Sequence, residues 1–582
     1  MTTSADATAV SEITGEPESE TGALRSEQRR SAVRMRNLLF TLAILVAATI
    51  VILWPVWAAP LSADQRYMYL NAAGRVQGNW LDIIGIPWSE VPERAELGRV
   101  TPVGYMIQWF FYTGIMELSV ATGTSVVVLH GAQKLLLLAA AILCVGAFVR
   151  SLRGRGPNGQ LVAPSASTVW LVVAGAVVLG AVGTQTHLQF RNGWVSYPVL
   201  TYGAVIVGFG VPALTLWLTR RMAERPNVSR TTIAATAMVL VGLLLNVSYE
   251  LYYVAFPAAV LALLLQPDPP DEGRRRTRVA KLVTGGTLSV AFLAAFVAIR
   301  MWTANACGDR CYVGTEVQLS GETLRITWYN LTSSLPLTGR TEALGGLARL
   351  GTDGLPQPFS SPLTIACVLA GVGVVAARIL LRPSSGPDDT VGDGADAEVG
   401  REHRRAESAA LIRGALVALA LTLGSAAVMS VSAQAPEIIL GMGYPYRHIV
   451  VTWIGLCVAG VLLLIAVDLL VGNRVGIVLW SATAAVAVLV AGVMLPINLQ
   501  STRAENLSRS TMVTEAIHRE VVRGDPSQSA DDRRCATLTA LAENRINPVT
   551  ERFITTSTQW AYRYFYGEPY CSDIPESDPP DQ

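Results

Sequence analysis

Long stretches without a single charged residue constrain this chain more than any other feature of its sequence. Five of them are at least as long as the roughly 20 residues that a helix needs to cross a ~30 Å hydrocarbon core. They cover residues 37–63, 156–190, 192–219, 354–377 and 475–502. Charged residues make up 15% of the chain, against about a quarter in an average soluble domain. The sequence therefore predicts an all-α polytopic membrane protein and excludes an array of soluble domains.

The apolar stretches predict eleven transmembrane helices. We expect them at 38–59, 126–149, 167–186, 196–218, 231–248, 251–266, 282–301, 361–381, 411–431, 448–469 and 476–496. With the N-terminus inside, the arginine clusters at 220–221, 274–276 and 404–405 all fall in cytoplasmic segments, as the positive-inside rule requires. Residues 1–37 show no cleavable signal and are predicted to be a disordered cytoplasmic tail.

The segments between the spans differ greatly in length. Within the transmembrane domain 38–496 we predict external loops at 60–124 and 302–360 and a cytoplasmic linker at 383–408. An external soluble region follows at 497–582, with helical segments at 503–523 and 536–566. Residues 100–116 carry no charge and are rich in aromatic residues, Glu117 interrupts this run, and at 102–120 we expect a helix in the outer membrane interface. A further span is the alternative, but it would move Arg150, Arg153 and Arg155 to the outside.

Cysteine positions agree with this topology. Four cysteines fall in external segments, where an oxidising compartment favours disulfides, and the simplest pairs are Cys307–Cys311 and Cys535–Cys571. A zinc site is the competing interpretation, although no histidine accompanies these cysteines at ligand spacing. The other three, Cys144, Cys367 and Cys457, fall within predicted spans and are expected to be core thiols.

Ionisable residues near the outer ends of the spans are the candidates for function, because a charge within the membrane is costly. Asp64 comes four residues after the first predicted span, and Lys134 lies about two turns into the second. The full set is Asp64, Arg66, Arg99, Lys134, Arg191, Glu250, Glu437, Arg447 and His448. Their shared side of the membrane predicts an external site that binds an anionic lipid head group and removes a proton from a substrate.

Each candidate also has a structural interpretation. Asp64 could cap a helix next to the membrane, and Lys134 could extend its long side chain to the interface. Glu250 could pair with a nearby arginine, and Arg447 could anchor the start of a span. His130 is expected to be a packing residue. No single residue decides between the two interpretations.

The arrangement of the first 150 residues resembles the GT-C class of membrane glycosyltransferases. One span is followed at once by an acidic residue in a long external loop, and an amphipathic segment precedes the second span. The stretches that carry the resemblance are 63–73, 98–103, 105–112 and 123–138. The resemblance implies a sugar donor linked to polyprenyl phosphate and used on the outer face of the membrane.

The sequence departs from this class at one position. Many members carry two acidic residues that are adjacent or one position apart, whereas here Gln65 and Arg66 follow Asp64. One carboxylate and one amide make a poor site for a hard divalent cation. A divalent metal is therefore weakly supported, and a metal-free mechanism with one general base is expected.

These observations predict an inverting glycosyltransferase of a bacterial plasma membrane that builds an envelope glycan or glycolipid. Asp64 would take the proton of an acceptor hydroxyl. Substrate contacts are expected from Arg66, Arg99, Lys134, Arg191, Glu250, Arg447 and His448, with Arg99, Lys134 or Arg447 on the phosphate. The alternatives are a lipid-linked glycan flippase or another transporter, a glycan polymerase or ligase, and a non-catalytic scaffold. No Walker-type GxxxxGK[ST] motif supports ATP-driven transport, and no nucleic-acid partner is expected.

Overall fold

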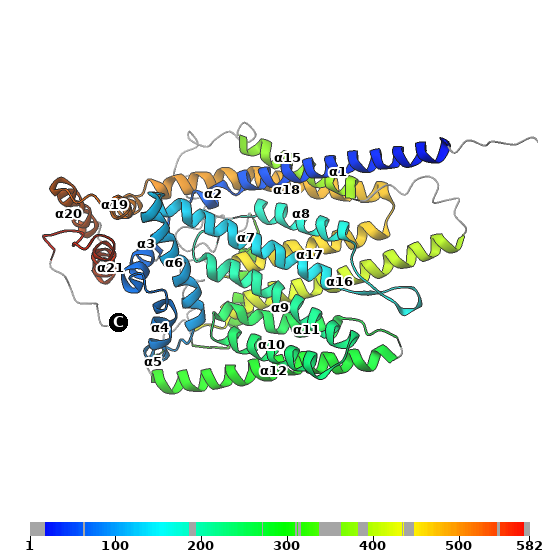
Figure 1. Cartoon of the computed structure of the whole chain (residues 1–582), viewed down its shortest axis with the longest axis horizontal. Helices are drawn as coiled ribbons and strands as arrows, with labels where there is room; N and C mark the ends of the chain where they lie inside the picture. Colours follow the sequence, from blue (N-terminus) through cyan, green and yellow to red (C-terminus); the bar gives the residue numbers. More distant parts are fainter. Residues whose placement is uncertain are drawn as a thin grey trace, which may run out of the picture.

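A computed structural model describes most of the chain. The described residues are 18–61, 65–184, 194–270, 272–308, 311, 316–336, 362–381, 394–433, 435, 447–543 and 548–574. Within them, nothing is described of the side chains of 18–34, 66, 158, 272, 362–364, 394–397 and 548–550. The described chain is almost entirely helical, and its long helices run side by side as one bundle (Figure 1).

A helix lies over each of the eleven predicted spans. These helices are α1 (Glu18–Ile52), α7 (Val126–Ser151), α8 (Ala166–Val182), α9 (Pro198–Glu224), α10 (Val228–Asn246), α11 (Ala255–Leu265), α12 (Glu272–Cys307), α15 (Pro362–Leu381), α16 (Gly394–Ser430), α17 (Ile449–Leu470) and α18 (Asn473–Asn506). Eight of them are long and apolar enough to cross a membrane, while α8, α15 and the segment Glu250–Leu265 are shorter apolar helices. The all-α membrane class is confirmed to this extent, and eleven crossings remain a prediction.

The bundle has two distinct ends (Figure 1). One end, which we call the hairpin end, carries the start of α1, the start of α16 and a small antiparallel hairpin of β1 (Gly154–Arg155) and β2 (Leu161–Val162). The other end, which we call the capped end, carries shorter helices from two distant parts of the sequence. They are α3 (Gln65–Val76), α4 (Asp82–Ser89), α5 (Val91–Glu96), α6 (Pro102–Thr122), α19 (Arg509–Arg523), α20 (Gln528–Glu543) and α21 (Pro548–Tyr566).

Segments that were predicted to face opposite sides of the membrane thus gather at opposite ends of the bundle. We expect the capped end to face the outside. Epitope tags inserted near residues 160 and 275 should then be protected in intact cells, and a tag near 560 should be accessible. Protease protection of each tag before and after detergent lysis measures this, with the untagged chain as the control. Access to the tag at 160 in intact cells would contradict the assigned orientation.

Helix α6 covers the segment that was predicted to lie in the outer interface. It begins with Pro102, whose missing N–H and fixed φ suit a first turn, and ends at Gly123, which adopts a left-handed conformation with φ of 70°. It is not among the helices that are both long and apolar enough to cross a membrane. In Figure 1 it runs across the ends of the long helices rather than along them. This orientation agrees with the interfacial interpretation.

Two segments predicted to be irregular are helical. Residues 18–37 of the predicted disordered tail belong to α1, and residues 394–408 of the predicted linker belong to α16. Both stretches are rich in glutamate and arginine, which favour helix as well as solvation. The Glu407 carboxylate is buried and accepts hydrogen bonds from the backbone N–H of Ser165 and the hydroxyl of Thr168, at the start of α8. The remaining parts, 1–17 and 383–393, lie outside the described residues.

The predicted tail 497–582 differs in detail from expectation. Helix α18 continues to Asn506, and the second predicted tail segment, 536–566, is occupied by two helices, α20 and α21. These helices share one hydrophobic core with the first external loop. Its buried members include Tyr69, Ala73 and Met116 from the loop and Ile517, Leu541 and Tyr562 from the tail. The loop and the tail therefore build the capped end together.

Helices α3 and α21 approach each other closely within this core. A Cβ atom on Gly74 would lie 2.8 Å from the Cβ of Trp560 and 2.9 Å from the backbone nitrogen of Ala561. Real Cβ atoms do not come so close to backbone, so α21 would have to move. Glycine at position 74 is what allows the two helices to cross here.

We expect Gly74→Val to destabilise the capped end by roughly 1–3 kcal/mol, the usual cost of overpacking a filled core. Gly85→Val is the matched control, because a Cβ on Gly85 of α4 meets nothing within 4 Å. Both changes place valine in a helix, so propensity effects largely cancel. Limited proteolysis of the α19–α21 segment should show faster cleavage in Gly74→Val alone. Equal cleavage of the two variants would contradict the crossing.

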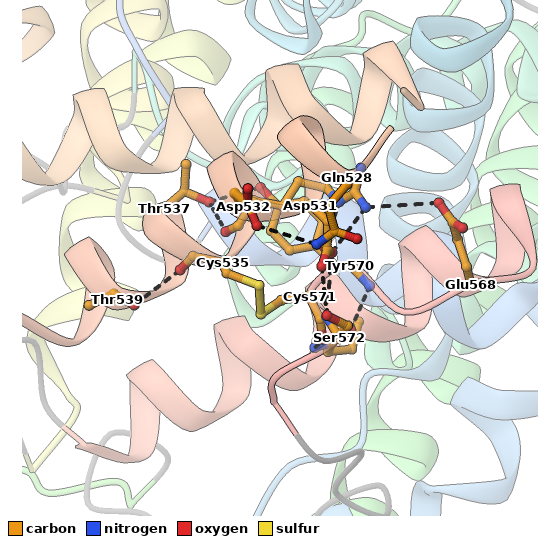
Figure 2. Close-up of a disulfide and its surroundings, with 12 residues drawn as sticks. Gln528, Asp531, Asp532, Cys535, Thr537, Thr539, Glu568, Tyr570, Cys571 and Ser572 are labelled. Carbon is orange, nitrogen blue, oxygen red and sulfur yellow. Dashed lines mark hydrogen bonds and ion pairs between the residues drawn. A yellow bond between two sulfur atoms is a disulfide. The ribbon is translucent and has the colours of Figure 1, made fainter. Parts of the chain in front are cut away.

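Both predicted disulfides are present. Cys307 pairs with Cys311, and Cys535 of α20 pairs with Cys571, which follows α21. Around the second bond, the Ser572 hydroxyl donates to the Asp531 carboxylate at 2.6 Å, as Figure 2 shows. The buried Arg534 guanidinium donates to the Tyr570 carbonyl at 2.6 Å. The end of the described chain is thus held to α20 by one covalent bond and several polar contacts. Cys144, Cys367 and Cys457 are free, as expected.

Candidate functional site

The predicted site residues fall into two groups. Asp64, Arg191 and Glu437 lie outside the described residues, and Arg66 is described only by its backbone in the first turn of α3. Arg99, Lys134, Glu250, Arg447 and His448 are described, and all of them lie at or near the capped end. The site below is built from these five and from the residues that contact them.

Lys134 is fully buried in α7. Its ammonium group donates a hydrogen bond of 3.0 Å to the carbonyl oxygen of Val56 in the short helix α2 (Trp54–Trp57). Among the described residues this carbonyl is its hydrogen-bond acceptor, and no carboxylate of the described chain lies within ion-pairing distance. The side chain does not extend into the interface, so the snorkelling interpretation does not hold. A buried ammonium with one neutral acceptor is poorly compensated.

One turn before Lys134, His130 forms a contact that the sequence analysis missed. Its Nδ1 lies 2.6 Å from the hydroxyl of Tyr69 in α3, and its Nε2 lies 3.4 Å from the Val195 carbonyl. In the tautomer with its proton on Nε2, His130 donates to the Val195 carbonyl and its Nδ1 accepts from the Tyr69 hydroxyl. Burial raises the pKa of the Tyr69 phenol well above its usual value, which keeps this donor protonated. The bond fixes α3 against the face of α7 that carries Lys134.

A buried polar chain extends from Tyr69 across the capped end. The Tyr69 ring packs on Tyr112 of α6, with ring centroids 4.6 Å apart. The amide of Gln108 donates to the Tyr112 hydroxyl at 2.5 Å, and the Tyr249 hydroxyl lies 2.7 Å from the Gln108 carbonyl oxygen. Gln108 and Tyr112 are one helical turn apart. The spacing places both polar groups on one face of α6, but nothing in it identifies their partners, and the sequence analysis missed the contact.

Arg99 and Glu250 are brought together by the fold. The Arg99 Nε lies 3.8 Å from the Glu250 carboxylate, and both side chains are about a quarter exposed, at 26% and 27%. Glu250 begins the 3₁₀ helix η3 (Glu250–Val254), which follows α10. Glu250 thus pairs with an arginine, as its structural interpretation predicted. The positive charge of Arg99 is thus partly matched within the chain.

A second ion cluster lies beside this pair and was not predicted. The Glu90 carboxylate, between α4 and α5, contacts Arg75 and Arg94, each at 2.6 Å. The Arg94 guanidinium lies 3.9 Å from the ring centroid of Tyr105 in α6, a cation–π geometry. Two arginines thus contact one buried carboxylate, so this group of three side chains has an excess positive charge.

Arg447 and His448 directly precede α17, which begins at Ile449. The His448 Nε2–H donates to the Asn330 carbonyl at 3.1 Å, in α13 (Glu322–Ser333). The Arg447 guanidinium lies 5.9 Å from the Tyr197 ring. Tyr197 follows Val195 by two residues, so one short segment contacts both His130 and Arg447.

An apolar cavity of about 480 Å³, part of it open, lies within the bundle on the side of Lys134 that faces the hairpin end. Leu138, one turn after Lys134, and Leu53, three residues before Val56, belong to its lining. The rest is contributed by apolar side chains of α7, α8, α9 and α17 together with Trp194. A cation at the head of an apolar cavity suits an amphiphile with an anionic head and a hydrocarbon tail.

Within the described residues, no group of three or more histidine, cysteine, aspartate or glutamate side chains could hold a metal ion. Asp64, the residue on which the sequence interpretation of a metal depends, lies outside them. No known family model matches the sequence, and no curated protein or solved structure is detectably similar to it. The functional argument therefore depends on the residues and geometry given above.

Proposed function

We propose that the chain is an inverting glycosyltransferase that moves a sugar from a polyprenyl-phosphate carrier to a glycan or glycolipid outside the cytoplasm. The observation that carries this proposal is Lys134. A fully buried ammonium with one carbonyl acceptor lies one helical turn from Leu138, which lines an apolar cavity. A bound lipid phosphate would supply the opposite charge and further acceptors, while its isoprenoid chain would occupy the cavity.

The surrounding residues support an anionic head group at the same end. Arg99 is about a quarter exposed, and its Nε lies 3.8 Å from the Glu250 carboxylate. The Tyr69–His130 bond holds α3, which starts one residue after Asp64, against the face of α7 that carries Lys134. A carboxylate at the start of α3 and a cation on α7 would then serve one substrate from two helices.

In the proposed reaction, the acceptor oxygen attacks the anomeric carbon as the bond from that carbon to the phosphate oxygen breaks. Asp64 takes the proton of the acceptor hydroxyl. The lipid phosphate leaves as an anion, and the Lys134 ammonium stabilises the charge that develops on it. Attack from the face opposite the phosphate inverts the anomeric configuration.

The proposal is tested with purified full-length protein in detergent. Polyprenyl-phosphate hexoses and pentoses with a labelled sugar are mixed with total envelope lipid and glycan. We expect the label to move from one of these donors to a new product in this single compartment. A lipid-linked glycan transporter would use the same cationic end without chemistry and would leave the label on the donor. Binding of the donor without any product would therefore favour transport.

A further inference from the structure

A second apolar cavity lies in a part of the bundle that the proposed function does not use. It comprises about 390 Å³ of space between α8, α15, α17 and α18, part of it open to the surroundings of the bundle. Its lining is apolar except for Thr483, whose hydroxyl donates to the Leu479 carbonyl of its own helix, and Trp480. None of the residues of the candidate site contributes to it.

Trp480 is the unusual member of this lining. Its side chain is 2% exposed, and its indole N–H has no hydrogen-bond acceptor among the described residues. A buried donor without a partner costs roughly 1–3 kcal/mol. Such a donor requires an explanation, and a group from outside the chain that accepts its hydrogen bond is one. The cavity beside it provides the room for that group.

The position of Trp480 along the bundle narrows the choice of ligand. It follows the start of α18 by seven residues, about 10 Å of helix, and helical side chains lean toward the N-terminus. The indole therefore lies toward the hairpin end of the cavity. One turn beyond the cavity, the buried Arg378 guanidinium contacts Asp468 at 2.9 Å and Asn473 at 2.6 Å. The positive charge of Arg378 is thus already balanced by the carboxylate of Asp468.

We propose that this cavity holds an acyl chain of a glycerophospholipid, with the ester carbonyl of that chain accepting a hydrogen bond from the Trp480 indole. The carbonyl of an ester lies at the edge of the hydrocarbon layer, which is the level of the first turns of α18. A neutral acceptor fits better than a fatty-acid carboxylate, because Asp468 already neutralises Arg378. The lining supplies hydrocarbon contact, and the indole supplies the polar contact.

The test compares two lipids that differ only in this acceptor. Full-length protein is stripped of lipid in detergent and mixed with a diester phosphatidylglycerol or with its diether analogue of equal chain length, which lacks carbonyls. Native mass spectrometry measures the bound fraction of each. We expect one lipid per chain, bound about three- to tenfold more tightly as the diester, the worth of one hydrogen bond. Equal affinity for the two lipids in the unmodified protein would overturn the proposal.

Two variants locate the site. Trp480→Phe keeps an aromatic ring but removes the N–H, so the diester should bind no better than the diether. Trp170→Phe is the matched control, since Trp170 of α8 is 54% exposed and outside the cavity lining, and it should keep the preference. Ala484→Leu places extra side chain in the cavity and should abolish binding of both lipids. A folded Trp480→Phe protein that retained the full diester preference would refute the assignment. Tighter binding of a free fatty acid than of the diester would refute it as well.

Discussion

Replacing Asp64 with asparagine is expected to lower sugar transfer at least about 100-fold while the protein still folds and binds its donor. A positioned carboxylate contributes about 10²–10⁴-fold by taking the proton of a weakly nucleophilic hydroxyl. Asparagine keeps the size and much of the hydrogen bonding of aspartate, but it cannot serve as that base. The measurement is the rate of product formation at saturating donor, together with donor affinity.

The alternative role of Asp64 makes the opposite prediction. In the sequence, residue 64 directly precedes Gln65, the first residue of α3, and the structural interpretation assigns it the role of a helix cap. Asparagine caps helices as well as aspartate does, so stability and turnover would both survive the change. Asp64→Ala separates the two roles further, because loss of a cap costs about 0.5–2 kcal/mol of stability. Near-normal turnover in Asp64→Asn would rule out Asp64 as the general base and leave the capping role.

The positions of the long helices could be predicted from the sequence because the signal is local. Each predicted span depends on about 20 neighbouring residues, and each coincides with a helix. The same logic failed at 394–408, where composition predicted a linker. Acidic and small residues are compatible with solvation and with helix. Only the contacts of the buried Glu407 of α16 with the start of α8 show that this stretch is a packed helix.

The contacts of the site could not be predicted in the same way, because they join distant parts of the chain. Tyr69 and His130 are 61 residues apart, and Tyr249 and Gln108 are 141 residues apart. Neither pair shows any periodicity that links its members. Sequence reasoning assigned His130 to packing, and the structure shows it bonded to the helix that follows Asp64. It did identify Lys134, because a lysine inside an apolar span is conspicuous without knowledge of its neighbours.

The two distant segments of the capped end illustrate the same limit. The first external loop and the C-terminal helices were predicted as separate external regions, since more than 370 residues lie between them. Their common core became visible only in the fold, where Gly74 of α3 meets Trp560 of α21. The disulfide between Cys535 and Cys571 was predictable, because both cysteines fall in one short external region of even cysteine count.

Replacing Lys134 with methionine is expected to weaken binding of polyprenyl phosphate by about 30-fold or more. Truncating one partner of a buried, hydrogen-bonded charge pair costs about 2–5 kcal/mol. Methionine has a similar length and no charge, so it should fill the space of the lysine stem without disturbing the cavity below. Sugar-free polyprenyl phosphate is the probe, and native mass spectrometry is the measurement. This test does not depend on the identity of the sugar or of the acceptor.

The stability of the same variant distinguishes a binding role from a structural one. Lys134 contacts the end of α2 through the Val56 carbonyl, where a cation also interacts favourably with the helix dipole. If that contact were its purpose, Lys134→Met would lower the melting temperature and leave lipid binding intact. We expect the reverse, because replacing a buried charge with an apolar side chain is often neutral or stabilising. Melting should therefore be unchanged or higher while binding falls.

The matched control is the other lysine of the chain. Lys281, in α12 near the hairpin end, contacts Asp268 at 2.7 Å and is partly exposed. Lys281→Met removes the same side chain and an actual ion pair, but it does so far from the candidate site along the bundle. It should leave polyprenyl phosphate binding unchanged. If both variants lost affinity equally, the effect would come from net charge, and the buried ammonium of Lys134 would no longer mark the site of the phosphate.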